Sequence, residues 1–410
     1  MDEFLIERLG HQGDGIATGP IFVPRSLPGE RVSGIRNGDR LSDVKIVEPS
    51  DQRVAPLCRH FKSCGGCQLQ HAAEPFVAEY KQQIVQSALE AHGIEAEFRP
   101  IATSLVQSRR RATFAVRRTK KGALWGFHAR GSDTVVAVPE CQLVLPELLN
   151  IDPLMNDLAR IGGSRKGEMA VNVTLSEVGL DIFVTGGKPL DNELTLGLSG
   201  IVEAHKLARL TWDDEVIGMR NPPFQKFGVS NVAPPPGSFL QATVHGQDVL
   251  TAAVMDAVSG EKGVDLFAGC GTFTLPLAAH YEMIALESEK PMIAALDRGW
   301  REAKGLKKVE AVARDLFRRP FLPDEMAKLD FAVLDPPRAG AEAQVAELAK
   351  SDVAHIAYVS CNPVTFARDA KVLINAGYVL TWVQVVDQFR WSSHVELAAQ
   401  FVRPHMLREK

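Results

Sequence analysis

From residue 241 onward the chain alternates between short apolar runs and segments with helical apolar spacing, and this alternation constrains the fold more than any other feature. The apolar runs read GVDLFAG, EMIALE, KVEAVARD, LDFAVLDPP, HIAYVSC, LTWVQVVDQF and VELAAQFV. Strands that alternate with helices form a doubly wound parallel sheet, and such sheets bind ligands beyond the carboxyl ends of their strands. We therefore predict an α/β, Rossmann-like domain over residues 241–410, with its functional residues at the strand ends.

The first of these strands runs into a glycine-rich turn, GVDLFAGCGTFTLPLA. Asp265 lies in the strand, and Gly269 and Gly271 lie in the turn, so the backbone can pass close to a ligand before the next helix begins. Phe273 and Thr274 stand where a dinucleotide fingerprint would have its third glycine, which disfavours NAD. A purely structural glycine turn is the alternative interpretation.

Acidic residues follow the next three strands. Glu287 ends the second strand, where it could hold ribose hydroxyls, and Asp315 follows the third. The fourth strand ends in DPPR, which contains Asp335 and Arg338. This pattern resembles class I S-adenosylmethionine methyltransferases. In the amino-group methyltransferases the comparable turn ends in an aromatic residue that stacks a flipped base, whereas this chain has Arg338 in that place.

Two residues could supply covalent chemistry at the same edge of the sheet. Cys361 follows the fifth strand in VSCNP, and Glu396 lies in SSHVELAAQF. Carbon 5 of uracil becomes nucleophilic only after a nucleophile such as a thiolate adds to carbon 6, and the carbon 5 proton must then be removed by a base. Taken singly, Cys361 is as readily a core residue and Glu396 a surface residue, so the chemistry depends on the pair.

Four of the six cysteines form a candidate metal centre. Cys58, Cys64 and Cys67 cluster in LCRHFKSCGGCQLQH, and Cys141 lies far downstream in VPECQ. In a reducing compartment such cysteines are ligands or catalysts before they are disulfides. A tetrahedral zinc site is one interpretation, but zinc sites more often use two paired knuckles, so the spacing favours a four-thiolate iron-sulfur cluster. Cys270 is interpreted as a packing residue.

The rest of the chain divides by its pattern. Residues 1–50 contain short β-like runs broken by glycine and proline, which predicts a small oligonucleotide-binding type of β-barrel. The segment EPFVAEYKQQIVQSALEAHGI predicts a helix ending at Gly93. The proline-rich stretch NVAPPPGSF marks a boundary. We therefore predict a central α+β domain over residues 51–240, between the barrel and the domain at 241–410.

The net charge and the hydropathy of the chain limit the partners that it can be expected to bind. A net charge of −4 argues against general coating of nucleic acid, but a basic track with aromatic neighbours could contact phosphate. The alternative is the solvated face of a two-stranded ribbon. Because the sequence has no long apolar run, we expect no membrane span, and we expect a cytoplasmic, monomeric protein. The track consists of Arg109, Arg110, Arg111, Arg117, Arg118, Lys120 and Lys121, with Phe114 and Trp125 nearby.

Together these motifs resemble the RNA uracil-5 methyltransferase family, in its iron-sulfur-containing branch, over nearly the whole chain. The resemblance implies an RNA-binding TRAM barrel at IERLGHQGDGIA and a [4Fe-4S] cluster on Cys58, Cys64, Cys67 and Cys141. It implies that SCNPVTFARD carries the nucleophile Cys361 and HVE carries the base Glu396. The residues that it implies for S-adenosylmethionine binding or for lining that pocket are Gln241, Phe267, Gly269, Gly271, Thr272, Glu287, Asp315 and Asp335.

The chain also departs from the family pattern. Thr272 replaces an asparagine that is common after the glycine turn, and DQFRWSSHVE has Phe389, Arg390 and Trp391 where many members have a Met-Phe-Pro-His-Thr run. The short barrel differs from the longer TRAM domain of many members. These positions are where cofactor, substrate and RNA contacts are expected to differ.

The resulting hypothesis is an enzyme that flips a uridine out of folded ribosomal or transfer RNA and methylates its carbon 5, with no role for DNA. Two other classes of protein are less consistent with the sequence than this enzyme. An iron-sulfur redox or radical enzyme is disfavoured because the CxxxCxxC triplet of radical enzymes is absent. A non-catalytic RNA-binding module is disfavoured because Cys361 and Glu396 are both present.

Overall fold

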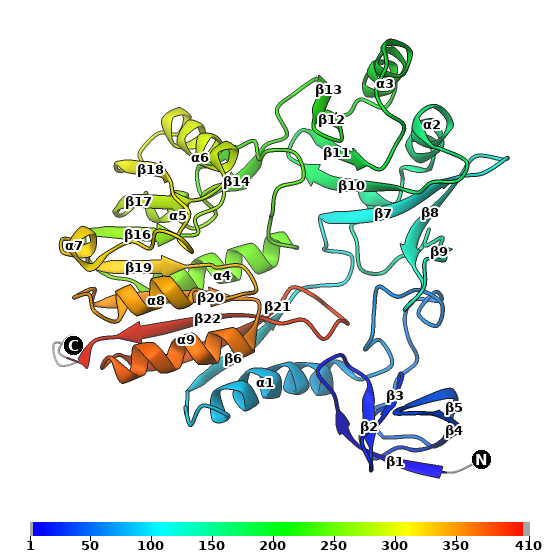
Figure 1. Cartoon of the computed structure of the whole chain (residues 1–410), viewed down its shortest axis with the longest axis horizontal. Helices are drawn as coiled ribbons and strands as arrows, with labels where there is room; N and C mark the ends of the chain where they lie inside the picture. The colour runs from blue at the N-terminus through cyan, green and yellow to red at the C-terminus, as the bar shows by residue number, and fades with distance from the viewer. Residues whose placement is uncertain (1–2, 405–410) are drawn as a thin grey trace.

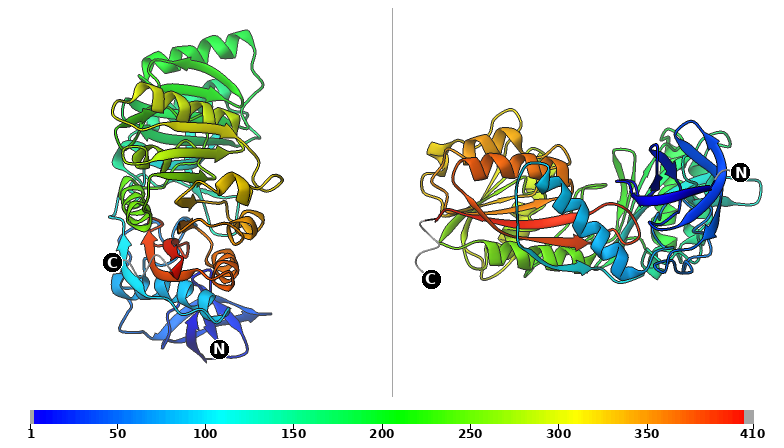
Figure 2. Two further views of the ribbon diagram at one scale, coloured as in Figure 1. Left: turned by 90° about the vertical axis from the view of Figure 1, so that its left-hand side faces the viewer. Right: turned by 90° about the horizontal axis from the view of Figure 1, so that it is seen from below.

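The computed structural model describes residues 3–404, which form a small barrel, a central domain and a larger α/β domain (Figure 1). The carboxyl ends of the parallel strands in the α/β domain face the other two units, as Figure 1 shows. Seen from below, the barrel and the central domain lie together at the opposite end of the molecule from the end of β22 (Glu396–Val402) (Figure 2). None of the helices within residues 3–404 is long and apolar enough to cross a membrane.

The amino-terminal barrel is closed, as the pattern of short strands predicts. Its strands pair in the order β1-β2-β3-β5-β4 around a small apolar core that includes Ile6, Val23 and Val32. The Arg130 guanidinium donates to both carboxylate oxygens of the buried Asp14, at 2.7 and 2.8 Å, and so ties the barrel to the central domain. The strands are β1 (Glu3–Leu9), β2 (Gly15–Ala17), β3 (Ile21–Val23), β4 (Arg31–Asn37) and β5 (Arg40–Glu48).

The central domain is built on a mixed sheet whose strand order is β13-β12-β11-β10-β7-β8-β9, with a separate hairpin, β14-β15. Helix α2 packs on β7 and β8, and α3 packs on β13 and α2. The strands are β7 (Arg111–Arg118), β8 (Ala123–His128), β9 (Val135–Val136), β10 (Met169–Ser176), β11 (Gly179–Thr185), β12 (Arg209–Trp212), β13 (Glu215–Met219), β14 (Gln225–Phe227) and β15 (Ser230–Val232). The helices are η1 (Pro146–Leu148), α2 (Asp152–Gly162) and α3 (Asn192–Ala204).

The α/β domain contains the predicted doubly wound sheet, in the order β18-β17-β16-β19-β20-β22-β21-β6. Strand β22 runs antiparallel to both of its neighbours, and the other pairs are parallel. Its strands are β6 (Phe98–Thr103), β16 (Lys262–Leu266), β17 (Glu282–Glu287), β18 (Val309–Ala313), β19 (Phe331–Leu334), β20 (His355–Ser360), β21 (Val379–Asp387) and β22 (Glu396–Val402). Its helices are α1 (Glu74–Glu90), α4 (Val244–Ala257), α5 (Thr274–Leu277), α6 (Lys290–Glu302), α7 (Pro323–Met326), α8 (Glu342–Leu348) and α9 (Pro363–Asn375).

Helices cover both faces of this sheet, which explains why its strands are apolar without alternation. In β19, Ala332 and Leu334 join the core under α1, α8 and α9, whereas Phe331 and Val333 join the core under α4, α5 and α6. A strand buried on both faces reads as a continuous apolar run. Polar side chains of the sheet are therefore expected at the ends of its strands rather than within them.

One part of the predicted central domain packs instead on the α/β domain. Helix α1 lies beside α9 and β21, and Figure 2 shows it running across the α/β domain. Strand β6 pairs with β21 and completes that edge of the sheet. An open sheet edge gains stability when another strand pairs with it, and no local pattern in residues 74–103 indicates which sheet they complete. The interval 51–240 is therefore divided between two bodies in space.

A buried ion pair fixes this docking. Lys81 in α1 donates to Asp387 at the end of β21 and to the carbonyl oxygen of Phe389, at 3.1 Å for the latter contact. Both charged side chains are almost fully buried. Burial lowers the pKa of Lys81 and raises the pKa of Asp387, and each partner's charge opposes the shift. Desolvation therefore outweighs the attraction for both groups, so each needs the other in order to stay ionised.

We predict that Lys81→Met will destabilise the protein by about 3–5 kcal/mol, because Asp387 then stays buried without its partner. The double variant Lys81→Met/Asp387→Leu should regain most of that loss, since no charge is left buried. Urea unfolding followed by fluorescence measures both. The control is Lys350→Met, which breaks the Lys350–Glu347 pair at 2.8 Å, where the lysine side chain is 62% exposed. That change should cost less than about 1 kcal/mol. Equal losses for the two single variants would contradict the prediction.

Candidate active site

The turn after β16 has the backbone geometry of a ligand-binding turn. Phe267, Gly269 and Gly271 all have positive φ angles, of 68°, 56° and 92°. A Cβ atom on Gly271 would lie 2.9 Å from Leu296 Cγ, so a side chain there is excluded by packing as well as by the backbone. Opposite the turn, Glu287 Oε2 accepts a hydrogen bond from the Gly269 backbone N–H at 3.2 Å. The turn and the acidic strand end thus hold each other in place.

A cavity of about 570 Å³ lies beyond the carboxyl ends of β16, β17, β19 and β20. Of the eight residues predicted for the cofactor, five line it: Phe267, Gly269, Thr272, Glu287 and Asp335. Its walls combine carboxylates with several aromatic rings, which suits a nucleoside-containing ligand.

The three other predicted cofactor residues lie outside the lining. Gly271 is packed beneath the turn. Asp315 accepts a hydrogen bond from the Phe317 backbone N–H at 3.0 Å, and Phe317 is the residue of that turn that lines the cavity. Gln241 is 1% exposed and bonds to Gln388 behind the cavity wall. Asp315 and Gln241 therefore sit one layer behind the surface that a ligand would touch.

Cys361 and Glu396 line the same cavity, although they come from different strands. Cys361 lies between the end of β20 and Asn362, which is the N-cap of α9. Asn362 Oδ1 accepts from the Val364 backbone N–H, so the helix begins directly after the thiol. A helix N-terminus stabilises negative charge beside it, which is a common setting for reactive cysteines. Glu396 opens β22 and is 2% exposed.

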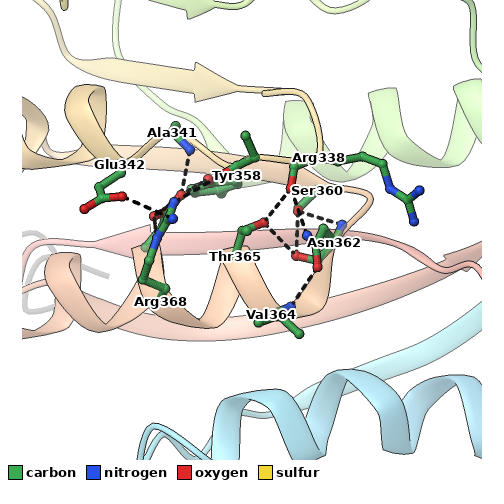
Figure 3. A network of polar contacts seen from close by, with 11 residues as sticks. Arg338, Ala341, Glu342, Tyr358, Ser360, Asn362, Val364, Thr365 and Arg368 are labelled. Atoms are coloured by element: carbon green, nitrogen blue, oxygen red, sulfur yellow. Dashed lines mark hydrogen bonds and ion pairs between the residues drawn. The ribbon is translucent and has the colours of Figure 1, made fainter. Parts of the chain in front are cut away.

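The loop that carries Arg338 is tied to the same helix start. The Arg338 carbonyl oxygen accepts from Asn362 Nδ2 at 2.8 Å and from Thr365 Oγ1 at 3.3 Å (Figure 3). Its side chain extends away from these contacts, as Figure 3 shows. The guanidinium lies 3.4 Å from His394 Nδ1, and both side chains line the cavity. The DPPR loop and the cysteine loop are thus one connected unit.

The site combines a weakly acidic thiol with a weakly acidic carboxyl group. Burial raises the pKa of Cys361 to about 11; the carboxylates of Glu396 and Asp335 add to this rise, and the Arg338 guanidinium opposes it. Burial raises the pKa of Glu396 to about 7, against a hydrogen bond from Gln388. Burial, followed by repulsion from Glu396 and Asp265, also raises the pKa of Asp335 well above its usual value. Glu396 can therefore exchange a proton near neutral pH.

A second cavity, of about 720 Å³, meets the first at Cys361. Arg338 and His394 line both cavities as well. The second cavity is bounded by the barrel residues His11 and Gln12 and by α1. Cys361 is therefore reached from one side through the cofactor-sized cavity and from the other through a groove leading to the barrel.

The structure corrects the interpretation of the basic track at its amino-terminal end. Arg110 is only 4% exposed, so the prediction that it contacts phosphate is wrong. Its Nε donates to the Gln241 carbonyl oxygen at 3.1 Å, and Arg111 Nη1 donates to the Leu240 carbonyl oxygen at the same distance. These arginines hold the segment 238–242 against the central domain. Lys120 and Lys121 at the other end of the track are exposed.

The four predicted cluster ligands lie in one region of the central domain. Each of Cys64, Cys67 and Cys141 has its pKa raised by burial first and then by neighbouring thiols of this set, Cys58 included. The Cys64 and Cys141 sulfurs accept backbone N–H groups of Gly66 and Leu143 at 3.3 and 3.4 Å. No group of three or more metal-ligating side chains within residues 3–404 converges closely enough to hold a metal ion.

Known proteins match this chain over its whole length. The family model described as tRNA (Uracil-5-)-methyltransferase matches residues 235–403. An uncharacterized RNA methyltransferase of Brucella suis is 40% identical over 404 residues, which cover 97% of each chain. The 23S rRNA (uracil(1939)-C(5))-methyltransferase RlmD of Vibrio vulnificus is 30% identical over 97% of this chain and 95% of that protein. The chain belongs to the RNA uracil-5 methyltransferase family.

A solved structure agrees with the fold of this RNA uracil-5 methyltransferase. The tRNA (uracil-54, C5)-methyltransferase of Pyrococcus abyssi, in complex with S-adenosyl-L-homocysteine, has a TM-score of 0.74 and 24% identity. The likeness covers 98% of this chain and 99% of that one, so the class I methyltransferase fold is confirmed. The cavity beyond β16 and β17, with Glu287 and the glycine turn, suits a nucleoside-containing ligand of this kind.

Sequence reasoning missed several residues that line the methyltransferase cavity. Phe239 and Phe317 are 59% and 50% exposed there, and Phe389 and His394 join them from the loop before β22. Exposed aromatic side chains at a cavity are a binding signal, but exposure is not visible in a sequence. In the sequence, Phe389 stands out only as a departure from the family pattern.

We predict that Glu287→Gln will weaken S-adenosylmethionine binding by about 10- to 100-fold, because a charged hydrogen-bond acceptor is lost from the cavity wall. Isothermal titration calorimetry measures the affinity. The control is Glu282→Gln, which changes an exposed carboxylate at the other end of the same strand, β17. That variant should bind as wild type does. Unchanged affinity in Glu287→Gln would show that the ligand lies elsewhere.

Proposed function

We propose that this enzyme methylates carbon 5 of a uridine in structured RNA through a covalent bond between Cys361 and the uracil ring. One observation carries the proposal: a thiol and a buried carboxyl group from different strands line one cavity with the glycine turn, and the thiol also borders a second groove. A nucleophile, a base and a place for the methyl donor are then within one site.

The chemistry assigns each residue one task. The Cys361 thiolate adds to carbon 6, and the electrons of the carbon 5–carbon 6 double bond move to the carbonyl oxygen at carbon 4. Carbon 5 of this enolate then takes the methyl group, which S-adenosylmethionine supplies from its sulfonium when bound. The Glu396 carboxylate removes the proton from carbon 5, the double bond re-forms, and the carbon–sulfur bond breaks to release the thiolate.

The neighbours of Cys361 have opposing effects on the first step. The thiol must lose its proton to attack, and its pKa of about 11 keeps it protonated near neutral pH in the free protein. Arg338 and the start of α9 favour the thiolate, whereas Glu396 and Asp335 disfavour it. Arg338 is therefore assigned to stabilising negative charge, both on the thiolate and on the enolate oxygen.

Ribosomal RNA is the proposed substrate class. The Vibrio relative at 30% identity acts on uracil 1939 of 23S rRNA, whereas the likeness to the tRNA enzyme, at 24%, shows the fold alone. The groove from Cys361 to the barrel loop at His11 gives a path for the strand that flanks a flipped nucleotide. Mapping 5-methyluridine by mass spectrometry in rRNA and tRNA from cells lacking the gene decides between the two substrates.

We also propose that Cys58, Cys64, Cys67 and Cys141 hold a [4Fe-4S] cluster; within residues 3–404 no three such side chains converge on a single ion, but a cluster takes each thiolate on a different iron. The support is chemical: the thiols lie within electrostatic reach of one another, and two of them accept backbone N–H groups, as thiolate ligands do. The Arg109 guanidinium interacts with Cys67 and Cys141 and would offset part of the negative charge of four thiolates. The cluster would stabilise the region between the barrel and β8 and takes no part in the methylation steps.

The Glu396→Gln variant should add its thiol to carbon 6 and transfer the methyl group, but it should fail to eliminate. RNA and labelled S-adenosylmethionine should therefore give a labelled protein–RNA band that survives a denaturing gel, at a level above that of wild type. Peptide mapping should locate the link at Cys361. In the matched control, Cys361→Ala/Glu396→Gln, the band should be absent, and Cys361→Ala alone should lose several orders of magnitude in turnover.

Other outcomes would redirect this assignment. If Glu396→Gln releases methylated RNA at the wild-type rate, another group removes the proton. If Cys361→Ala keeps its turnover, the nucleophile lies elsewhere. The first result contradicts only the role of Glu396 as the base, and the second contradicts only the role of Cys361 as the nucleophile. The two roles are separable because addition to carbon 6 precedes removal of the carbon 5 proton.

Anaerobically purified protein should be brown, with broad absorption near about 400 nm and about four irons per chain. Replacing Cys141 by Ser should bleach the protein and lower the iron content, since one of four thiolate ligands is lost. The control is Cys270→Ser, because Cys270 is buried beside the glycine turn and is no part of this set. Iron and zinc are measured by plasma mass spectrometry. One zinc and no iron would contradict the cluster.

A further inference from the structure

The carboxyl group of Glu396 is anchored by one neighbouring amide. Within the described residues its only side-chain hydrogen bond comes from Gln388, whose Nε2 lies 2.9 Å from Glu396 Oε2. The same Nε2 lies 2.5 Å from Gln241 Oε1. All three side chains are at least 98% buried. Both amide protons of Gln388 are thus used, one on each acceptor.

The orientation of the Gln388 amide is fixed by a third contact. Its Oε1 accepts the Ala242 backbone N–H at 2.8 Å. A backbone N–H can only donate, so the amide oxygen must face Ala242 and the amide nitrogen must face Glu396. A flipped amide would turn two oxygens toward each other at both other contacts. The amide nitrogen of Gln388 must therefore donate a hydrogen bond to Glu396.

The segment that orients Gln388 is itself held by the central domain. Arg110 donates to the Gln241 carbonyl oxygen and also to Gln225 Oε1 and Gln247 Oε1, at 3.3 and 2.8 Å. Burial lowers the pKa of Arg110 to about 10, yet its hydrogen bonds go to amide and carbonyl oxygens. Arg110, Gln241 and Gln388 thus form a buried polar chain that ends at Glu396.

We propose that Gln388 is a positioning residue that aims the Glu396 carboxylate into the cavity and keeps it ionised for proton removal. This inference rests on the proposed role of Glu396 as the base. Gln388 does not itself line the cavity, and the lining residue that its amide contacts is Glu396, so it acts only through Glu396. It also lies in the loop where this chain departs from the family pattern.

The charges around Glu396 show why a donor is needed there. Asp335, beyond β19, and Cys361, beyond β20, both interact electrostatically with Glu396, and both of these neighbours are acidic groups. In β21, Asp387 is paired with Lys81 of α1, and the buried residues of α4, which packs on β22, are uncharged. Arg338 is the cation on the cavity side. The hydrogen bond from Gln388 lowers the pKa of Glu396 against its burial.

Gln388→Met removes the donor and keeps the length of the side chain. The pKa of Glu396 should rise, so the breakdown of the methylated protein–RNA adduct should reach half its maximal rate about one pH unit higher than in wild type, where the midpoint is near 7. At pH 7 adduct breakdown should slow about fivefold, by the same shift. S-adenosylmethionine affinity should stay unchanged.

The readout is single-turnover quenching between about pH 5.5 and 9.5, with adduct and released RNA counted on one gel. The control is Gln344→Met, since Gln344 is an equally buried amide that accepts from and donates to the Phe321 backbone at 2.7 and 3.0 Å, away from both cavities. Its pH profile should match that of wild type. If Gln388→Met does not fold, Gln388→Asn, which is too short to reach Glu396, should show the same alkaline shift.

An unshifted profile in a folded Gln388 variant, or a loss of rate that is equal at every pH, would overturn the inference. Failure of the proposed function looks different. In that case Glu396→Gln itself releases methylated RNA normally, whatever Gln388 does. If elimination stalls in Glu396→Gln but the pH profile of adduct breakdown in Gln388→Met matches wild type, only the positioning role of Gln388 is contradicted. The role of Glu396 as the base then stands.

Discussion

The active site depends on a loop, residues 388–395, that segments from the amino-terminal quarter of the chain hold in place. Lys81 of α1 binds Asp387 and the Phe389 carbonyl oxygen at the start of the loop. Farther along, the Trp391 carbonyl oxygen accepts the backbone N–H groups of Gln68 and Leu69, at 2.7 and 2.9 Å. The loop brings aromatic and imidazole groups to the cavity and leads into β22, which begins with Glu396. The amino-terminal segments are therefore part of the machinery that builds the site.

This dependence explains which parts of the fold the sequence could predict. The strands of the α/β domain and their order along the chain follow from local apolar runs, and the closed barrel follows from short strands between glycines and prolines. The addition of β6 beside β21 does not, because it depends on a contact between residues nearly three hundred positions apart in the chain. Arg110 likewise reads as a surface cation in sequence, and only its amide and carbonyl partners reveal a buried support.

The residues of the candidate site also fall into two groups, those that the sequence could predict and those that it could not. Glu287, Asp335 and Cys361 could be predicted because a general rule places ligands at the carboxyl ends of parallel strands, and the structure brings them to one cavity. Gln241 was expected to touch the cofactor, but the structure places it behind the wall, bonded to Gln388. No spacing rule pairs two amides that are 147 positions apart, so second-layer contacts of this kind are invisible before the fold is known.

The acidic groups of the cavity give the site its chemical character. Asp265, Asp335 and Glu396 are all buried, and burial raises the pKa of each; repulsion from Glu396 and Asp265 raises that of Asp335 further. Burial, and then the charges of Glu396 and Asp335, raise the pKa of Cys361 to about 11, so near neutral pH the free protein holds this thiol protonated and the Glu396 carboxyl group, with its pKa of about 7, partly protonated. A positive charge placed in this cavity favours the ionised forms of all of these groups together, and by linkage the ionised groups favour the cation. Under the proposed function, the sulfonium of S-adenosylmethionine would be such a cation, and its binding would favour the ionised forms of the Cys361 thiol and the Glu396 carboxyl group.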